Sequence, residues 1–413
     1  MREPPAVAVP AHLHNDNRAN CPVPTTSSTF DVVIAGAGPA GSSAAAVLTT
    51  AGLRVALVDK ARFPRDKLCG GLLSERSVHA LHAVFGADSD LPIEVTSTGA
   101  AVFDRDRPLV RVDACKPLHF TSRRSFDAHL ASLAARRGAR LVEDCAITAV
   151  DPVEHAVELA DGRVLSAPFV IGADGASSRI RKLAGVAIDR SGFAVGLETE
   201  VPREAAGRDV RDPEIYFGLV EWGYAWIFPK RATLTVGIGG LAAENGDMRT
   251  RFREFATTAL GRVPAQAPCG SPIPFGNFVA TPGNGSTLLA GDAAGLVEPL
   301  TGEGIAFAVQ SGAYAAQAII EAARAKAPSR ALAFYLPRYR SIVRSFRDVR
   351  LLRRLVFSRT TRALFLRALN GNRRMVLKHM DVLAGDADYR DYARYALTET
   401  LQRLPRLCVA ALR

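Results

Sequence analysis

A glycine-rich stretch near the start of the chain carries the residues best suited to chemistry. The sequence GAGPAG at 36–41 follows apolar residues that predict a strand, and the small residues after it predict a helix. A second apolar stretch ends on Asp59, 18 residues after Gly41. Such glycines let the backbone approach a pyrophosphate at a helix N-terminus, and an acid at this distance can bind a ribose. The stretch therefore predicts dinucleotide binding rather than a purely structural strand–helix–strand unit.

Two aromatic residues and a cysteine form a second group of candidates. Tyr224 and Trp226 alternate along a predicted strand, so their side chains share one face. Packing in the core is the ordinary role of such a pair. The alternative is an apolar wall in which the Tyr224 hydroxyl donates a hydrogen bond or a proton. Cys69 precedes two glycines, Gly70 and Gly71, whose backbone could approach a flat group.

The elements that position these residues follow from apolar periodicity and from turn residues. The predicted helices cover 74–85, 123–137, 247–260 and a long segment after Gly304 to about Ala325. The predicted strands and hairpins cover 31–35, 54–58, 99–113, 140–150, 169–173, 193–241 and 286–290, with a turn at 161–162. Strands alternate with helices in the first part of the chain, as expected for a parallel sheet.

The whole chain has 413 residues, of which 48% are hydrophobic and 23% charged, as in an ordinary globular protein of two or three subdomains. Six cysteines show no zinc-type spacing, so we expect no metal site, no disulfide framework and a reducing, cytoplasmic compartment. Residues 1–29 lack the apolar core of a secretory signal and predict a flexible leader. No apolar run reaches the ~18 residues of a transmembrane helix.

The net charge of +11 is concentrated in one C-terminal segment. Arg338 to Lys378 contains thirteen Lys and Arg against one acid, so this segment carries +12 and the rest of the chain −1. Its apolar residues follow helical spacing, and several arginines fall on another face. We consider a docked helix with a solvated basic face and, as the alternative, peripheral contact with an anionic membrane on its cytoplasmic face. Nucleic acid is not an expected partner, because no recognised binding motif accompanies the charge.

The motifs together resemble the geranylgeranyl reductase family of FAD-dependent oxidoreductases, within the p-hydroxybenzoate-hydroxylase-like flavoproteins. The resemblance covers about residues 30–325. It includes GAGPAG with its acid, the ADG at 173–175, and GD at 291–292 followed by GEG at 302–304. The strings GYAWIFPK at 223–230 and KxCGG at 67–71 are similar to geranylgeranyl reductases specifically.

The resemblance implies roles for individual residues. Cys69 and Tyr224 are the catalytic candidates, with Cys69 close to the flavin and involved in proton delivery or substrate placement. Arg123 would neutralise the FAD phosphates, Asp292 would bind a ribityl hydroxyl, and the helix after Gly304 would direct its N-terminus at the flavin. The substrate-binding candidates are Gly70, Gly71, Trp226 and Phe228. The cofactor-binding candidates are Gly36, Gly38, Pro39, Ala40, Gly41, Asp59, Lys60, Arg123, Asp174, Gly291, Asp292, Gly302, Gly304 and Ile305.

The expected fold class is α/β, with a Rossmann-like FAD-binding domain, an inserted β-rich (α+β) substrate domain and a C-terminal helical segment. We expect the FAD-binding domain in three parts and the substrate domain in two. The predicted order is leader 1–29, FAD-binding 30–95, substrate 96–117, FAD-binding 118–185, substrate 186–274, FAD-binding 275–330 and a basic helical region 331–413.

The expected function is an FAD-dependent reductase that saturates carbon–carbon double bonds of an isoprenoid chain on a prenyl lipid or pigment. Because the chain has no second complete GxGxxG, NAD(P)H or another reductant would dock transiently. A flavin-dependent monooxygenase or halogenase is one alternative, since the aromatic string is related to the WxWxIP of halogenases. A non-catalytic, membrane-associated flavoprotein is the other.

Overall fold

The computed structural model describes residues 28–402. Most of the predicted leader lies outside these residues. Its last two, Ser28 and Thr29, form strand β1 and pair with residues 165–166, so the prediction of a flexible segment is wrong at that end.

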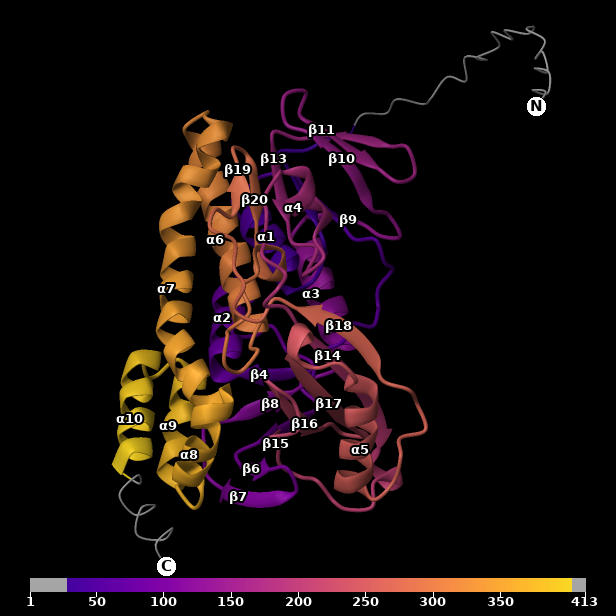
Figure 1. Ribbon diagram of the computed structural model, residues 1–413. Coiled ribbons are helices and arrows are strands. Elements are labelled where there is room, and N and C mark those ends of the chain that lie inside the picture. The colour runs from indigo at the N-terminus through magenta and orange to yellow at the C-terminus, as the bar shows by residue number, and fades with distance from the viewer. Residues whose placement is uncertain (1–27, 403–413) are drawn as a thin grey trace, which may run out of the picture.

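Within residues 28–402, the strands form four sheets (Figure 1). The six-stranded sheet has the order β19 (Gly283–Asn284), β20 (Thr287–Leu289), β13 (Phe169–Gly172), β2 (Val32–Ala35), β3 (Val55–Val58) and β9 (Arg140–Val142). The seven-stranded sheet has the order β18 (Cys269–Ile273), β14 (Ala194–Pro202), β17 (Thr233–Leu241), β16 (Tyr224–Pro229), β15 (Glu214–Phe217), β6 (Ala100–Asp104) and β7 (Arg107–Val112). A four-stranded sheet orders β1, β12 (Val164–Ser166), β11 (Ala156–Leu159) and β10 (Ile147–Asp151), and a three-stranded sheet orders β4 (Leu72–Ser74), β8 (Leu118–Phe120) and β5 (Val95–Ser97).

The helices cover the six-stranded sheet and extend past it. Over residues 28–402 they are α1 (Pro39–Thr50), α2 (Glu75–Phe85), α3 (Arg123–Arg136), α4 (Arg179–Leu183), α5 (Met248–Leu260), α6 (Ile305–Arg324), α7 (Ala331–Phe357), α8 (Arg359–Leu369), α9 (Arg373–Ala384) and α10 (Tyr389–Gln402). Figure 1 shows α7 running along one edge of the molecule, beside α6 above and toward α8–α10 below. The short 3-10 turn η3 covers Gly291–Ala294.

The core of the six-stranded sheet is parallel, and β20, β13, β2, β3 and β9 run side by side in one direction. Strands β2, β13 and β3 are buried along their whole length, as their apolar sequences require in a sheet covered on both faces. Helices α1 and α6 pack very closely, because a Cβ at Gly312 would lie 2.1 Å from the carbonyl oxygen of Ala40. The carboxyl ends of the parallel strands therefore meet the N-termini of both helices.

The structure corrects a predicted strand and divides the predicted helical segment. The strand expected over 140–150 is divided into β9 and β10, which belong to different sheets. The chain turns between them at Asp144, which has a left-handed backbone (φ 54°). The helical spacing of the basic segment from Arg338 continues across two helices, α7 and α8, which meet at Ser358, and α7 begins already at Ala331.

The apolar face predicted for the basic segment is packed against the protein. Tyr339 and Phe346 join the core of the six-stranded sheet, and Val349, Leu352 and Val356 join a core shared with the seven-stranded sheet. The arginines predicted on the other face are exposed, and they are Arg340, Arg344, Arg347 and Arg354. This arrangement is that of a docked helix with a solvated basic face.

Candidate active site

The glycine-rich turn joins β2 to the N-terminus of α1. Gly36 has φ 94°, and a Cβ there would lie 2.4 Å from the carbonyl oxygen of Ala173, so only glycine fits. Pro39 and Ala40 begin the helix, and its N-cap, Gly38, makes no side-chain capping bond. A Cβ at Gly38 would meet no atom closer than Nη2 of Arg65, at 3.7 Å. The turn therefore presents uncapped N–H groups, as a pyrophosphate requires, to a space bordered by the Arg65 guanidinium and, at 3.8 Å, by Oδ2 of Asp127, which pairs with Arg65.

Asp59 and Arg65 close the side of this space. The Asp59 carboxylate accepts the Ala37 N–H at 2.8 Å and the Ala61 N–H at 3.0 Å, and its Oδ2 lies 3.5 Å from Nη2 of Arg65. Arg65 also pairs with buried Asp127 at 3.1 Å. Sequence reasoning missed Arg65, because an arginine in a predicted loop carries no periodic or motif signal.

The predicted residues of the later flavin segments lie around the start of α6. Gly291 has φ 59° and donates its N–H to the Ser311 hydroxyl at 2.9 Å. Gly304 is the N-cap of α6 without a side-chain capping bond, and Ile305 is the first buried residue of that helix. Oδ1 of Asp292 lies 3.5 Å from the position of a Cβ at Gly304. A second uncapped helix N-terminus thus stands beside a carboxylate, as the ribityl and ring ends of a flavin require.

Of two other predicted cofactor residues, Asp174 has local partners and Lys60 is exposed. The Asp174 carboxylate accepts the Arg179 N–H at 2.6 Å and the Ile180 N–H at 3.1 Å, so it caps α4 while lying next to Gly36. A cofactor role for either residue remains a prediction.

Arg123 is buried at the start of α3 and holds a bidentate pair with Asp127, at 2.7 and 2.8 Å. The cation at a helix N-terminus is therefore compensated by an acid one turn later. Asp127 and the nearby Cys69 side chain outweigh burial and raise the pKa of this guanidinium. Arg123 thus links Cys69 to the Asp127–Arg65 pair beside the glycine-rich turn, which is consistent with its predicted place near the phosphates.

The predicted aromatic residues form one row on β16. Ring centroids of Tyr224 and Trp226 are 5.9 Å apart, and those of Trp226 and Phe228 are 6.2 Å apart. The Tyr224 hydroxyl donates to the carbonyl of Thr301, and burial raises its pKa. Residues of other elements extend this aromatic row at both ends, and they are Phe120, Phe217, Phe275 and Phe357.

The Cys69–Gly71 segment covers one end of the aromatic row. A Cβ at Gly70 would lie 2.7 Å from the Phe228 ring and 3.4 Å from Nε1 of Trp226, and Gly71 (φ 75°) lies against Thr121. At the other end, a Cβ at Gly302 would lie 3.6 Å from the Tyr224 hydroxyl. The structure therefore brings the predicted substrate residues together, with the predicted flavin loop at one end and Cys69 at the other.

A link between the two flavin-facing segments is provided by Lys67, whose Nζ lies 3.9 Å from Oδ2 of Asp292. Lys67 belongs to the same loop as Cys69, and Asp292 belongs to η3. The KxCGG segment and the segment before α6 are thus neighbours across the proposed flavin position, although 225 residues separate the two side chains in the sequence.

Two glutamates that sequence reasoning did not select, half-buried Glu198 and fully buried Glu298, flank the aromatic row. Oε1 of Glu198 accepts the Cys69 N–H, and burial raises the Glu198 pKa to about 7. Glu298 accepts N–H groups of Leu300 and Thr301 together with the Thr301 hydroxyl, and burial raises its pKa to about 7 as well. Within residues 28–402, Oε2 of Glu198 and Oε1 of Glu298 are buried without a hydrogen-bond partner.

The residues described fit FAD at this position. Two helix N-termini without capping side chains, the open space at Gly38 and the nearby Arg65 suit the phosphates and the polar ends of the cofactor. Gly36, Gly38, Arg65 and Arg123 would lie on the dinucleotide side, and Asp292 with Gly304 would lie on the flavin side.

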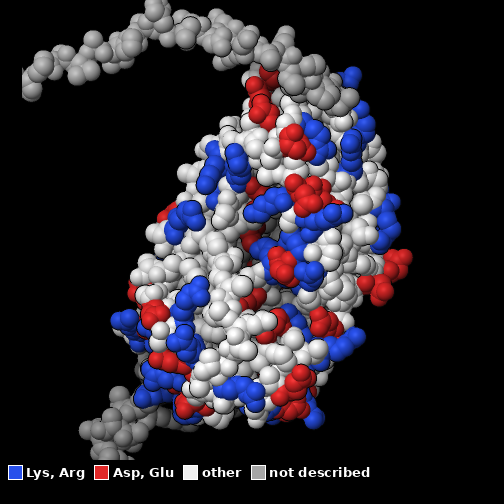
Figure 2. All heavy atoms as spheres, turned by 90° about the vertical axis from the view of Figure 1, so that its right-hand side faces the viewer, with Lys and Arg blue, Asp and Glu red and all other residues white. Residues whose placement is uncertain are grey.

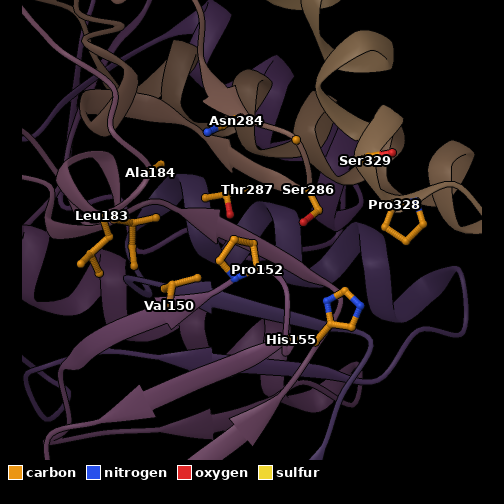
Figure 3. Close-up of a pocket in the computed structure, with 12 residues that line it drawn as sticks. Val150, Pro152, His155, Leu183, Ala184, Asn284, Ser286, Thr287, Pro328 and Ser329 are labelled. Carbon is orange, nitrogen blue, oxygen red and sulfur yellow. The ribbon is translucent and has the colours of Figure 1, made fainter.

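A separate pocket of about 280 Å³ lies at the amino end of β20, whereas the glycine-rich turn lies at the carboxyl end of β2 (Figure 3). His155 and Pro152 of the β10–β11 turn face Ser286, Thr287 and Pro328 across it. Thr287 begins β20, whereas the glycine-rich turn follows the end of parallel β2, so this pocket is not the dinucleotide site. Figure 2 shows a hollow halfway down the face that includes α5 and β18, with side chains of both charges around it.

Comparison with known proteins decides the family. A model of the FAD binding domain matches residues 29–209 and 249–348. The chain is 30% identical to the geranylgeranyl diphosphate reductase of Rhodobacter capsulatus over 308 residues, which cover 70% of this chain and 74% of the relative. The chain belongs to the geranylgeranyl reductase family of FAD-dependent oxidoreductases. The predicted family, enzyme class and FAD-binding character are thereby confirmed.

Other relatives of the chain have different names. The menaquinone reductase of Mycolicibacterium smegmatis is 31% identical over 315 residues, 70% of this chain and 75% of the relative. Digeranylgeranylglycerophospholipid reductase 2 of Methanosphaera stadtmanae is 30% identical over 310 residues, 69% of this chain and 76% of the relative. The family is thus shown, while the substrate differs among relatives of equal similarity.

Solved structures confirm the predicted α/β flavoprotein fold. A geranylgeranyl bacteriochlorophyll reductase-like protein from Thermoplasma acidophilum has a TM-score of 0.73 at 23% identity, over 92% of this chain and all of the other. A flavin-dependent brominase has a TM-score of 0.69 at 16% identity, over 91% of this chain and all of the other. The fold is common to reductases and halogenases and does not separate them.

Proposed function

We propose that this reductase saturates carbon–carbon double bonds of an isoprenoid chain. The observation that carries the proposal is the aromatic row on β16, covered by the Cys69–Gly71 segment and joined to the flavin loop through Tyr224. A long apolar chain can lie along such a row with its double bonds held at a fixed position. Names of relatives support prenylated substrates, since they include reductases of geranylgeranyl diphosphate and of digeranylgeranylglycerophospholipid.

The reaction requires that the alkene be held in place and that water be excluded. Bound FAD, once reduced, supplies a hydride to one alkene carbon. Trp226 and Phe228 form an apolar surface against which the chain is oriented. Gly70 lets the backbone approach that surface, because any larger residue would collide with the Phe228 ring. An isolated alkene is a poor electrophile, so this positioning is the main contribution of the protein.

The electron donor and the membrane contact belong to the same proposal. A nicotinamide or another reductant would dock transiently. Contact with anionic lipid would use the exposed arginines of α7, because the apolar face of that helix is packed inside the protein. Between Ser28 and Gln402, none of the helices is both long enough and apolar enough to span a bilayer.

An anaerobic single-turnover experiment tests the proposal. The FAD-loaded protein is reduced with dithionite and mixed with geranylgeranyl diphosphate, and flavin absorbance and product mass are followed together. We expect flavin reoxidation and a gain of two mass units per reduced bond. Cys69→Ala should slow this step, and Cys145→Ala, at a buried cysteine of the six-stranded sheet core, serves as the matched control.

The other outcomes separate the alternative functions. Reoxidation by oxygen only, with an aromatic substrate hydroxylated or halogenated, would establish a monooxygenase or halogenase. A reduced flavin that no prenyl compound reoxidises, and that oxygen reoxidises without altering an aromatic substrate, would favour the non-catalytic, membrane-associated flavoprotein.

A further inference from the structure

Glu198 and Trp226 lie on the same face of the seven-stranded sheet. Both residues pair directly with Gly237 of the strand between them, Glu198 from β14 and Trp226 from β16. Directly paired residues place their side chains on one face. A Cβ at Gly237 would lie 2.3 Å from the Trp226 ring, so the indole lies over the glycine and extends toward Glu198.

The covering segment meets this pair of side chains. The Cys69 N–H bonds to Oε1 of Glu198, and the position of a Cβ at Gly70 is 3.4 Å from Nε1 of Trp226. Oε2 of Glu198 and Nε1 of Trp226 are both buried, and neither has a hydrogen-bond partner among residues 28–402. A buried polar atom without a partner is destabilising, so such atoms in a site suggest a role in binding or chemistry.

The charged groups around Glu198 leave it without a cation of its own. Arg123 of α3 is paired with Asp127, and Lys230 at the end of β16 is 2.7 Å from Glu200. Burial accordingly raises the pKa of Glu198 to about 7, and the Cys69 N–H and Lys230 only partly offset it. Burial also acts on Glu200, two residues along the same strand, but Lys230 lowers the pKa of that carboxyl overall.

We propose that Glu198 is a catalytic residue that supplies the proton completing alkene reduction, an inference that rests on the proposed function. Saturation of one double bond adds a hydride to one carbon and a proton to the other. The Glu198 O–H bond breaks, a C–H bond forms on the second carbon, and Glu198 is left as a carboxylate. A proton from water then restores the acid before the next turnover.

The experiment uses the full-length FAD-loaded protein in single turnover with geranylgeranyl diphosphate between pH 5 and 9. In the wild type, flavin reoxidation should slow as pH rises through about 7, because the protonated acid is consumed in the step. Glu198→Gln should be slower by about 100-fold or more and lose this pH dependence. Glu198→Asp should keep part of the rate with a shifted inflection.

Glu200→Gln is the matched control, since it makes the same change on the same face of β14. It should keep the wild-type rate at low pH and a pH-dependent profile, with the inflection at lower pH because the Glu200 charge helps to raise the Glu198 pKa. FAD affinity and the Glu198 carboxyl band in infrared titration provide readouts that do not depend on turnover. A Glu198→Gln rate within threefold of the wild type, with the inflection retained, would overturn the inference alone. A wild-type flavin that geranylgeranyl diphosphate does not reoxidise would overturn the proposed function and this inference with it.

Discussion

Two positions along the aromatic row contain the same residue type in opposite arrangements. At the Tyr224 end, Glu298 is fully buried and accepts three hydrogen bonds from the two residues that follow Pro299 in its own loop. In the middle of the row, level with Trp226, Glu198 is half-buried and accepts a hydrogen bond from the backbone of Cys69, a residue from a distant part of the chain. The pKa of each is raised to about 7.

The comparison shows that a raised pKa alone does not assign a role. Glu298 fixes the conformation of the loop between η3 and α6, and its bonds are local. Glu198 connects a sheet to the segment that covers the substrate row, and its second oxygen is buried without a hydrogen-bond partner among residues 28–402. The two roles, loop stabilisation by Glu298 and proton supply by Glu198, are assigned from the hydrogen-bond partners of each carboxyl and not from its pKa.

The largest expected effect is on pH-dependent stability. Because the folded state binds protons more tightly at Glu298, the free energy of unfolding should fall as pH rises from about 4.5 to about 7, by about 3 kcal/mol for this group. Glu298→Gln should remove this part of the pH dependence of the free energy of unfolding. Glu198→Gln should remove a smaller part, since Glu198 is partly solvated. Urea unfolding at pH 5 and pH 8 measures both. Equal pH dependence in wild type and Glu298→Gln would refute the assignment.

Gly70→Val should affect the part of the aromatic row that lies beside Glu198, at Trp226 and Phe228. The added side chain would displace the Phe228 ring, because even a Cβ would lie 2.7 Å from it. We expect single-turnover reduction of the prenyl substrate to slow about 100-fold while FAD remains bound. Gly246→Ala, where a Cβ meets no atom within 4 Å, is the control. Normal turnover in Gly70→Val would place the substrate elsewhere.

Glu298→Ala should affect the flavin end. Loss of the three bonds frees the loop that precedes α6, and we expect FAD affinity to weaken about 10- to 30-fold, equivalent to about 2 kcal/mol. Glu298→Gln should have a smaller effect. Equilibrium titration of the apoprotein with FAD measures this, and an unchanged affinity in Glu298→Ala would contradict a loop-fixing role.

The smallest catalytic effect is expected at the exposed arginines of α7, away from Glu198 and Glu298. Replacing the exposed arginines 340, 344, 347 and 354 with glutamine should change turnover of soluble geranylgeranyl diphosphate less than twofold. Retention on vesicles that contain phosphatidylserine should fall, since each cation near an anionic surface contributes about 1 kcal/mol. Vesicle sedimentation at two salt concentrations measures this retention. Equal retention of the wild type and the variant would rule out an electrostatic contact through α7.

The sequence was sufficient where local chemistry determines structure. The glycines at 36–41, the strand before them and Asp59 after them predict the dinucleotide turn, because each position has its own backbone requirement. Alternation along 224–228 predicts a shared face for the aromatic residues. The domain boundaries stay a prediction.

Residues that act through distant contacts could not be predicted in this way. Glu198 enters the site only through the register that pairs it with Gly237, and no local pattern gives that register. Arg65 gains its place from contacts with Asp59 and Asp127 in two other elements. The break at Ser358 depends on how α7 and α8 pack against the seven-stranded sheet.

Photo-crosslinking with a prenyl diphosphate that carries a photoreactive group on its chain tests the substrate position most directly. The label should appear in peptides containing 66–72 and 222–230, which meet at Gly70 and Phe228. Excess geranylgeranyl diphosphate should prevent the labelling. Labels confined to the pocket between His155 and Pro328, or to the exposed face of α7, would contradict a substrate site on the aromatic row.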